Sequence, residues 1–583
     1  MHSTPRRLGI VRFLYTQNPF YLLSTGLVLY GLHVSFGAEG VGDFDRWALL
    51  ASLCGYTLLT AVTAVLVIRL GKVWDDARSL LLILCLLFLA VSTCMDEFCN
   101  TQPELAPKLA GLGFLFSAAV SEGVLRFSPI RLPLLFRAPY YLILGLFFVY
   151  PLAVSPEITQ LGEPPIRWRL LLFPALCGLA FLTLTPAARR GPRYASRSGA
   201  PWPWPLFPWS LFFFLALGVG LRSFLLCVSF DRNQGMDTIF GGYFLTPLLL
   251  ALAVVVVEIM RRHDEPEMQG VVMLLAPLLL PLSARWSRID SASDAFYHEV
   301  TGTYGSPLWL TLLALAAFYA YGMRRRAPLA ETGLTFSLLA LCFVGRETDG
   351  LQTLVAPQWL PLLALSGVQA ALAARRRTTG RYLAASLSLA AAGYVLLRQT
   401  DYAELALPIV VHGVLLAILT IGATRSGELA GFLRTISSIG IAGLAIASVL
   451  WSGELWTNGD WLKELRPGLV ASNSESLAAE LQLIYLTGMA LLALGYWRLT
   501  RERCALAAGG ANLCLEYACQ GWWLSGLLLE RLGPRGFATL AAGTLCFLIA
   551  ALISAAKGGL LAVLWRKTRR YWTTALATPS VRA

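Results

Sequence analysis

Charged residues and the motifs of soluble enzymes are scarce in this sequence. Only 14% of its 583 residues are charged, whereas 56% are hydrophobic, and the mean hydropathy is +0.63. The core of a water-soluble protein cannot hide that much apolar surface, but the hydrocarbon of a bilayer can solvate it. The sequence also contains no nucleotide-binding motif, no serine-nucleophile motif and no H-E-x-x-H zinc motif. These absences argue against a soluble globular enzyme of the common classes.

Cysteine and histidine are not spaced as metal ligands. The eleven cysteines contain no C-x-x-C pair, and together with the five histidines they form no zinc-like spacing. Cys94 and Cys99 are close enough in sequence to pair, but the favoured interpretation is that each packs as a small apolar side chain. His412 is the only histidine well inside a predicted span, which argues against bis-histidine haem. We therefore expect no metal and no other cofactor.

The sequence is rich instead in long apolar runs. Each run has about 17–25 residues, which is the length that a helix rising about 1.5 Å per residue needs to cross about 30 Å of hydrocarbon. We predict an all-α, polytopic transmembrane helix bundle that forms a single integral membrane domain over residues 1–583. The eighteen predicted spans are 18–36, 47–70, 79–95, 106–125, 138–154, 168–187, 208–229, 238–260, 269–284, 306–323, 330–345, 354–374, 381–397, 405–424, 433–452, 477–498, 505–529 and 537–557.

The charges between the spans predict their orientation. If the N-terminus faces the cytoplasm, every second connection is basic, and that side collects roughly two thirds of the 47 Lys and Arg residues. Positive charge resists translocation, so we predict that both termini are cytoplasmic. The cytoplasmic parts would be residues 1–17, the connector 188–207, which is rich in Arg, Pro and Trp, and the basic tail 558–583.

This orientation also explains the net charge of +13 without a nucleic-acid partner. The sequence predicts a multi-pass protein of the cell membrane whose partner is the lipid bilayer. Its oligomeric state is left open.

Two consecutive hairpins share a pattern with a period of about 51 residues. Each begins with three arginines, at 324–326 and 375–377, and reaches an Arg-x-Thr-Asp sequence after one span, at 346–349 and 398–401. The pattern predicts parallel repeats of a helix hairpin. Topology alone also accounts for it, because Arg precedes a span on the cytoplasmic side and acids follow it on the outer side. Both interpretations remain open.

Polar side chains deep inside predicted spans are the main functional candidates, because such groups are costly in hydrocarbon unless they are paired or hydrated. Asn512, Glu516 and Gln520 recur at every fourth position and form one polar stripe on an otherwise apolar helix. Helix rise places Glu516, Arg222 and His412 at a similar depth near the midplane. These groups form either a substrate or proton site, or a structural Glu516–Arg222 ion pair that locks helices together.

Four other glutamates lie near the ends of predicted spans, where a long side chain can reach water. They are therefore weaker candidates for a site. They are Glu122, Glu258, Glu331 and Glu480.

Prolines interrupt two of the predicted spans. Pro277 and Pro281 fall within 269–284, and Pro357 and Pro361 fall within 354–374. A broken helix frees carbonyl groups that can coordinate an ion or face a substrate, although an ordinary kink has the same sequence.

Asp43 and Asp45 stand in the first predicted outer connection, just before the second span. In this loop and in its many spans, the chain resembles membrane glycosyltransferases that use lipid-linked sugar donors. The resemblance implies that one of these carboxylates acts as a base or holds a metal ion.

Three functional classes follow from these observations. We favour a transporter or channel with a polar midplane site over an enzyme, because short connections leave little machinery outside the bilayer. The alternatives are the glycosyltransferase that uses Asp43 or Asp45 and a non-catalytic membrane scaffold. The substrate, whether a small molecule, an ion or a lipid, is not indicated.

Overall fold

The computed structural model describes eight segments of the chain, and all regular structure within them is helical. The chain divides into two compact units, Met1–Val368 with Ala391–Gln399, and Gln369–Ala390 with Thr400–Ala583. We call them the first and the second unit. The described segments are 20–36, 43–199, 201–202, 206–231, 238–285, 291–348, 354–450 and 474–557.

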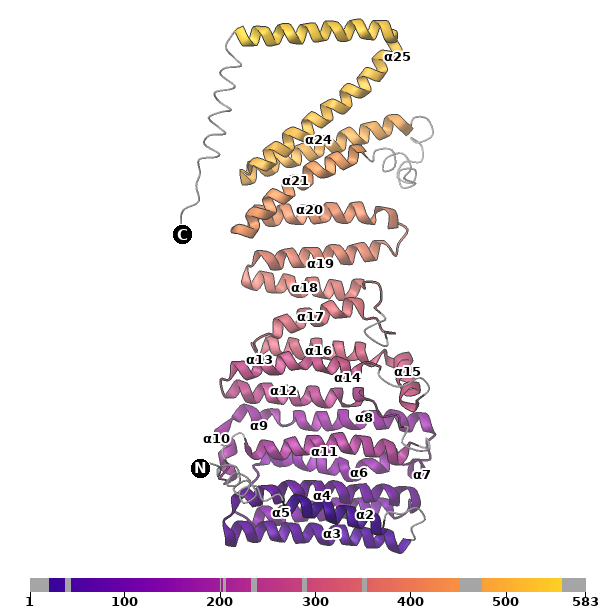
Figure 1. Ribbon diagram of the computed structural model, residues 1–583, viewed down its shortest axis with the longest axis vertical. Helices are drawn as coiled ribbons and strands as arrows, with labels where there is room; N and C mark the ends of the chain where they lie inside the picture. Colours follow the sequence, from indigo (N-terminus) through magenta and orange to yellow (C-terminus); the bar gives the residue numbers. More distant parts are fainter. Residues whose placement is uncertain are drawn as a thin grey trace, which may run out of the picture. The chain divides into compact units, whose positions relative to one another are not determined.

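The helices follow one another along the chain with short connections (Figure 1). In chain order they are α2 (Phe20–Phe36), α3 (Asp43–Leu66), η1 (Val67–Gly71), α4 (Trp74–Thr101), α5 (Ala106–Phe127), α6 (Leu134–Val154), α7 (Pro156–Thr159), α8 (Glu163–Leu182), α9 (Thr185–Arg190), α10 (Pro192–Ala195), η2 (Ser196–Ser198), α11 (Leu206–Phe230), η3 (Gly242–Leu245), α12 (Thr246–Arg262), α13 (Pro266–Leu275), η4 (Ala276–Leu278), α14 (Leu279–Ser283), α15 (Ala292–Tyr304), α16 (Pro307–Arg324), α17 (Ala330–Phe343), α18 (Trp359–Arg376), α19 (Thr379–Leu397), η5 (Ala403–Leu405), α20 (Ala406–Thr424), α21 (Glu428–Leu450), α24 (Ser474–Thr500) and α25 (Arg503–Lys557).

Local sequence explains where many of these helices begin. Proline occupies the first turn of α5, α8, α12 and α16, where its missing N–H group costs no hydrogen bond. At α16 the preceding Ser306 also caps the helix, because its hydroxyl accepts a hydrogen bond from the Trp309 amide at 3.2 Å.

Twelve of the described helical segments are long and apolar enough to cross a membrane. A thirteenth candidate is the pair α15 and α16, which is bent by 57° between Tyr304 and Pro307. The chain is therefore a multi-spanning membrane protein. The remaining predicted spans coincide with α2, α17, α18 and α25, so the total of eighteen spans stays a prediction.

Several predicted boundaries were wrong. Helix α4 continues to Thr101, six residues beyond the predicted end of its span. Pro357 precedes α18 and Pro361 lies in its first turn, so no proline interrupts this helix. The break predicted near Pro277 does occur, as the short 3-10 segment η4.

The last two predicted spans lie on one element, α25. This helix is broken at Gly533, whose φ of 67° lies in the left-handed region, just before Pro534.

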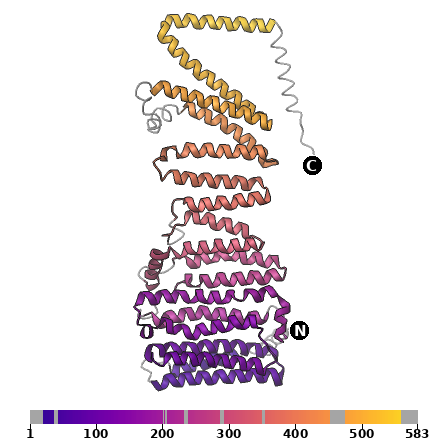
Figure 2. The same ribbon diagram turned by 180° about the vertical axis from the view of Figure 1, so that it is seen from behind.

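In the first unit the long helices lie side by side with nearly parallel axes (Figure 1, Figure 2). Helix α4 contacts α2, α3, α5, α6 and α11, and it is the most buried of the candidate spans. Its inward side chains join one large apolar cluster with residues such as Phe88, Phe147 and Phe173. Leu58, Phe213 and Leu274 are among many large apolar side chains on the outside, as expected of a surface that faces lipid.

Ion pairs in the first unit join helix ends that the sequence predicts on the same side of the membrane. Arg46 and Glu97 belong to connections predicted to lie outside, and Arg46 Nε contacts Glu97 Oε1 at 2.6 Å. Arg189, Glu258 and Arg325 belong to ends predicted to be cytoplasmic, and they also contact one another. The alternation of ends agrees with the predicted topology, whereas the cytoplasmic location of the termini stays a prediction.

The second unit has a smaller apolar core between α20, α21, α24 and α25. Leu415, Ile441, Leu486, Ala493 and Ala505 are buried there. Small residues at this core let α24 and α25 approach closely, which is a common way for helices to pack in a membrane.

The arginine triplets of the two predicted repeat hairpins end in the same backbone conformation. The last arginine of each triplet, Arg326 and Arg377, has a left-handed backbone with φ of 58° and 54°. Each terminates the preceding helix. The similarity supports a shared turn, and duplication of the hairpin stays a prediction.

The predicted orientation can be tested at the two ends of α19. In a variant without native cysteines, Asp401→Cys should react with a membrane-impermeant thiol reagent on intact cells. Arg376→Cys should react only after permeabilisation, because about 28 Å of helix separates the ends. Arg324→Cys serves as a second cytoplasmic marker. Labelling of Arg376→Cys and Asp401→Cys from the same side would contradict the topology.

Candidate functional site

Arg222 is completely buried in the first unit and forms an ion pair with Asp96 of α4. The guanidinium donates two hydrogen bonds to the two carboxylate oxygens, one of them from Nη2 to Oδ1 at 2.6 Å. Nη2 also contacts the carbonyl oxygens of Ser92 and Phe147, each at 3.3 Å. The pair therefore joins α4, α6 and α11.

This geometry corrects the predicted partner of Arg222. The sequence suggested Glu516, whereas the structure places the carboxylate of Asp96 against the guanidinium. Asp96 was assigned to an outer connection because its span was predicted to end at residue 95. The extra turns of α4 carry Asp96 into the core, where only 3% of its surface is exposed.

The polar stripe of α25 faces α24 within the second unit. Glu516 is partly exposed, and its Oε1 accepts hydrogen bonds from Thr487 Oγ1 at 2.8 Å and from Gln520 Nε2 at 3.4 Å. Asn512 is 1% exposed, and its side-chain Nδ2 has no hydrogen-bond partner among the described residues. The structure thus brings the three predicted residues to one helix face, and a role for them in transport stays a prediction.

His412 also lies in the second unit, between α20 and α24. Its Nε2 contacts the Tyr485 hydroxyl at 2.8 Å, and its Nδ1 contacts the carbonyl oxygen of Pro408 at 2.7 Å. Both ring nitrogens therefore have partners. Because Arg222 belongs to the first unit and Glu516 to the second, a shared layer of the three ionisable groups stays a prediction.

Asp43 and Asp45 lie in the first turn of α3. The side chain of Asp45 is partly exposed, and that of Asp43 lies outside the described part of the structure. Among the described residues, no three His, Cys, Asp or Glu side chains are grouped so that they could hold a metal ion.

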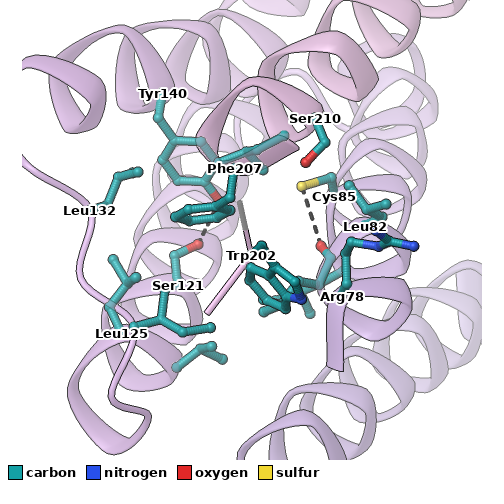
Figure 3. Close-up of a pocket in the computed structure, with 15 residues that line it drawn as sticks. Arg78, Leu82, Cys85, Ser121, Leu125, Leu132, Tyr140, Trp202, Phe207 and Ser210 are labelled. Carbon is teal, nitrogen blue, oxygen red and sulfur yellow. Dashed lines mark hydrogen bonds between the residues drawn. The ribbon is translucent and has the colours of Figure 1, made fainter. Parts of the chain in front are cut away.

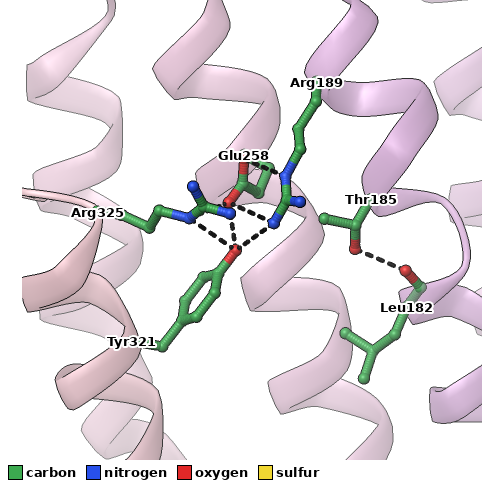
Figure 4. A network of polar contacts seen from close by, with 6 residues as sticks. All are labelled: Leu182, Thr185, Arg189, Glu258, Tyr321 and Arg325. Atoms are coloured by element: carbon green, nitrogen blue, oxygen red, sulfur yellow. Dashed lines mark hydrogen bonds and ion pairs between the residues drawn. The ribbon is translucent and has the colours of Figure 1, made fainter.

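Glu258 was judged a weak candidate, yet it is the centre of a polar network (Figure 4). Its side chain is 3% exposed and contacts Arg189 of α9 at 3.2 Å and Arg325, next to α16, at 2.7 Å. The Tyr321 hydroxyl donates to the same carboxylate, and Arg325 stacks over the Tyr321 ring at 5.3 Å. This network, which we call the Glu258 network, connects the ends of α9, α12 and α16.

A polar cavity of about 970 Å³ lies at the same end of the first unit, where α5 ends and α6 begins. We call it the basic cavity, because among the described residues four arginines line it and Glu122 is the one acidic residue. The arginines come from two regions that are distant in sequence, one from the last turn of α5 to the first turn of α6 and the other between α8 and α11. They are Arg126, Arg131, Arg137 and Arg197.

The single carboxylate of the cavity is already engaged. Glu122 contacts Arg137 at 3.4 Å and accepts a hydrogen bond from the Tyr141 hydroxyl at 2.7 Å. Neither Arg126 nor Arg131 has an acidic partner within the described residues, and both are exposed to the cavity. The basic cavity therefore carries uncompensated positive charge.

Two connections form the wall of the basic cavity. The Arg131 amide donates to the carbonyl oxygen of Ser198 at 2.6 Å. Gly199 approaches the carbonyl oxygen of Pro129 so closely that a Cβ atom would lie 2.7 Å from it, and its φ is +65°. Arg197 lies over the ring of Tyr194 at 5.8 Å. These contacts hold the two arginine-bearing connections together.

An apolar pocket of about 70 Å³ adjoins the basic cavity, and the two share Leu125 and Leu132 as lining residues. Figure 3 shows the rings of Tyr140, Trp202 and Phe207 converging on it from different parts of the chain. Among the polar groups of the pocket, the hydroxyls of Ser121 and Tyr140 lie 2.8 Å apart, whereas the buried Nε1 of Trp202 has no hydrogen-bond partner among the described residues.

The charged groups of the basic cavity and the apolar walls of the adjoining pocket suit an amphiphilic ligand. The sequence had assigned these arginines to orientation alone, and no spacing in it indicates that two distant connections meet.

Comparisons with known protein families, with curated proteins and with solved structures gave no match. The fold and site therefore define a class, a multi-spanning helical membrane protein with a basic cavity at one end of its first unit.

We expect the Asp96–Arg222 pair to stabilise the first unit strongly. Asp96→Asn should lower the free energy of unfolding by about 3–5 kcal/mol, because it leaves a buried cation unpaired. The double variant Asp96→Leu with Arg222→Met should recover most of this loss. Thermal and denaturant unfolding of the full chain in detergent measures both effects.

Glu516→Gln is the matched control for the pairing. It should lower the free energy of unfolding by about 1 kcal/mol at most, which is typical of one weakened hydrogen bond. Glu516→Gln could instead lower the free energy of unfolding as much as Asp96→Asn does, and Arg222→Gln could restore it. That result would show that Arg222 pairs with Glu516 and not with Asp96.

Proposed function

We propose that this protein is a membrane carrier for an anionic amphiphile, and that the basic cavity with its adjoining apolar pocket recognises the cargo. The observation that supports this proposal is the convergence of four arginines around one engaged glutamate, next to an apolar pocket. Positive charge at this end also follows from topology. Its concentration around one cavity, from two separate connections, favours a binding role.

Electrostatics favour an anionic group such as a phosphate or carboxylate in the basic cavity. Guanidinium groups form paired, charge-assisted hydrogen bonds with the oxygens of these anions. Arg126 and Arg131 lack acidic partners within the described residues, so they are available for such bonds. The apolar pocket behind them contacts the non-polar part of the molecule that lies next to the anionic group.

A carrier suits the architecture better than an enzyme that uses Asp43 or Asp45. Asp45 lies in the first turn of α3, whereas the basic cavity lies near the opposite end of the neighbouring helices. From Asp45 to Leu66, the last residue of α3, the helix rises by about 31 Å. A carboxylate at that distance has no access to a phosphate in the basic cavity, so the glycosyltransferase interpretation receives no support from this site.

Most of the described chain consists of spanning helices and short connections. In this architecture a binding site must lie within or beside the helices. Membrane carriers of this kind transport a bound molecule by moving their helices around it. The midplane candidates Glu516 and His412 are compatible with a second function in the cycle, such as proton transfer.

Arg126→Gln and Arg131→Gln should each weaken binding of dodecyl phosphate by about tenfold. Each removes a charge-assisted hydrogen bond worth about 1.5–3 kcal/mol, and about 1.4 kcal/mol corresponds to a tenfold change. Equilibrium binding to the full chain in phosphatidylcholine nanodiscs measures the affinity, and flux of the same probe into proteoliposomes measures transport.

Arg324→Gln is the matched control, because Arg324 is exposed on the same predicted side but does not line the cavity. Its affinity and flux should match those of the unmodified chain. Equal affinity of all variants, or binding without flux, would contradict the carrier and favour the scaffold interpretation.

A further inference from the structure

An apolar groove of about 500 Å³ runs between α3 and α5, and the last turns of α5 contribute residues to both this groove and the basic cavity. All its lining residues are apolar. They are Leu58, Ala61, Val62, Val65, Leu66, Phe116, Ala119, Val120, Gly123, Val124 and Phe127. Leu58, Val62, Leu66 and Phe127 are each about half exposed, so the groove opens on the outer surface of the first unit.

Helix α5 connects this groove to the candidate site. Its last turns contribute Gly123 and Phe127 to the groove, Val124 to both the groove and the apolar pocket, and Glu122 and Arg126 to the basic cavity. A molecule that lies along these turns can therefore contact the groove with one part and the arginines with another.

The length of the groove matches one leaflet of a bilayer. From Phe116 to Phe127 helix α5 rises by about 17 Å. Half of a hydrocarbon core of about 30 Å is similar. Arg126 lies in the last turn of α5 and Arg131 follows this helix. The groove therefore occupies the hydrocarbon depth of the leaflet whose headgroups are level with the basic cavity.

We propose that the cargo is a phosphate-bearing lipid of this leaflet, which enters sideways with its chain in the α3–α5 groove and its headgroup in the basic cavity. This inference rests on the proposed function and names the cargo class and the entry route. The occupant of the groove is the hydrocarbon chain of the molecule whose phosphate the arginines bind.

The basic cavity and the groove contribute differently to binding of the lipid. A chain gains little by moving from lipid into an apolar groove, because lipid tails are as apolar as the leucines that line it. Affinity therefore comes from the arginines, and the groove supplies access. A bulky side chain in the groove should exclude a lipid but not a soluble phosphate that reaches the arginines from water.

Gly123 and Gly111 provide a matched pair for this test. Both lie on α5, and a Cβ atom at either position would meet nothing within 4 Å. Only Gly123 lines the groove. Gly123→Trp should weaken binding of long-chain phosphatidic acid in phosphatidylcholine nanodiscs at least tenfold, while Gly111→Trp should leave it unchanged. Binding of butyl phosphate should be the same in both variants.

Ala119→Trp, at an exposed position in the same groove, should repeat the effect of Gly123→Trp if that variant folds poorly. Unchanged affinity for phosphatidic acid in both groove variants would overturn sideways entry. If the unmodified chain binds butyl phosphate but not phosphatidic acid, the lipid cargo is also wrong. In either case, loss of dodecyl phosphate binding in Arg131→Gln would still support the proposed function. An unmodified chain that binds none of the three probes would contradict both proposals.

Discussion

The burial of Arg222 is the constraint around which the first unit is organised. A guanidinium in an apolar interior is tolerated only when its charge is paired. Asp96 supplies the charge, and the carbonyl groups of Ser92 and Phe147 accept further hydrogen bonds. These partners fix α4 and α6 against α11. The same three helices contribute Cys85, Tyr140 and Ser210 to the apolar pocket several turns away. The ion pair thus holds the walls of the site without touching it.

Length and hydropathy were sufficient to predict the long apolar helices of this protein, but not short ones such as α7 and α15. Each of the eighteen apolar runs falls on a helix, because hydrocarbon forces the backbone of a span to satisfy its own hydrogen bonds. The same argument does not predict that Asp96 is buried. An acidic residue at the end of an apolar run normally marks the water interface, and nothing local shows that α4 continues. Its partner is 126 residues away, a pairing that only the packing of α4 against α11 creates.

The candidate site was less accessible to sequence reasoning. The depth of Arg222 in its predicted span indicates a buried charge, and its side chain is buried. Arg126, Arg131 and Arg197 give no such signal, because arginines at cytoplasmic ends are common in all membrane proteins. These arginines line one cavity because two segments that are distant in sequence lie against each other. Gly199 approaches Pro129 closely where the two segments meet. The groove beside them is equally invisible in sequence, since its lining differs in no way from other lipid-facing residues.

The Glu258 network gives the proposed carrier a physical connection between cargo and helix movement. Arg189 and Arg197 belong to one short segment that joins α8 to α11. Arg189 is bound to Glu258 of α12, while Arg197 lines the basic cavity. A ligand shifts a conformational equilibrium only through contacts that differ between the two states. A headgroup that draws Arg197 inward acts on the segment whose other end is anchored at α12 and α16 (Figure 4). We therefore expect occupation of the basic cavity to change the spacing of these helix ends through that segment.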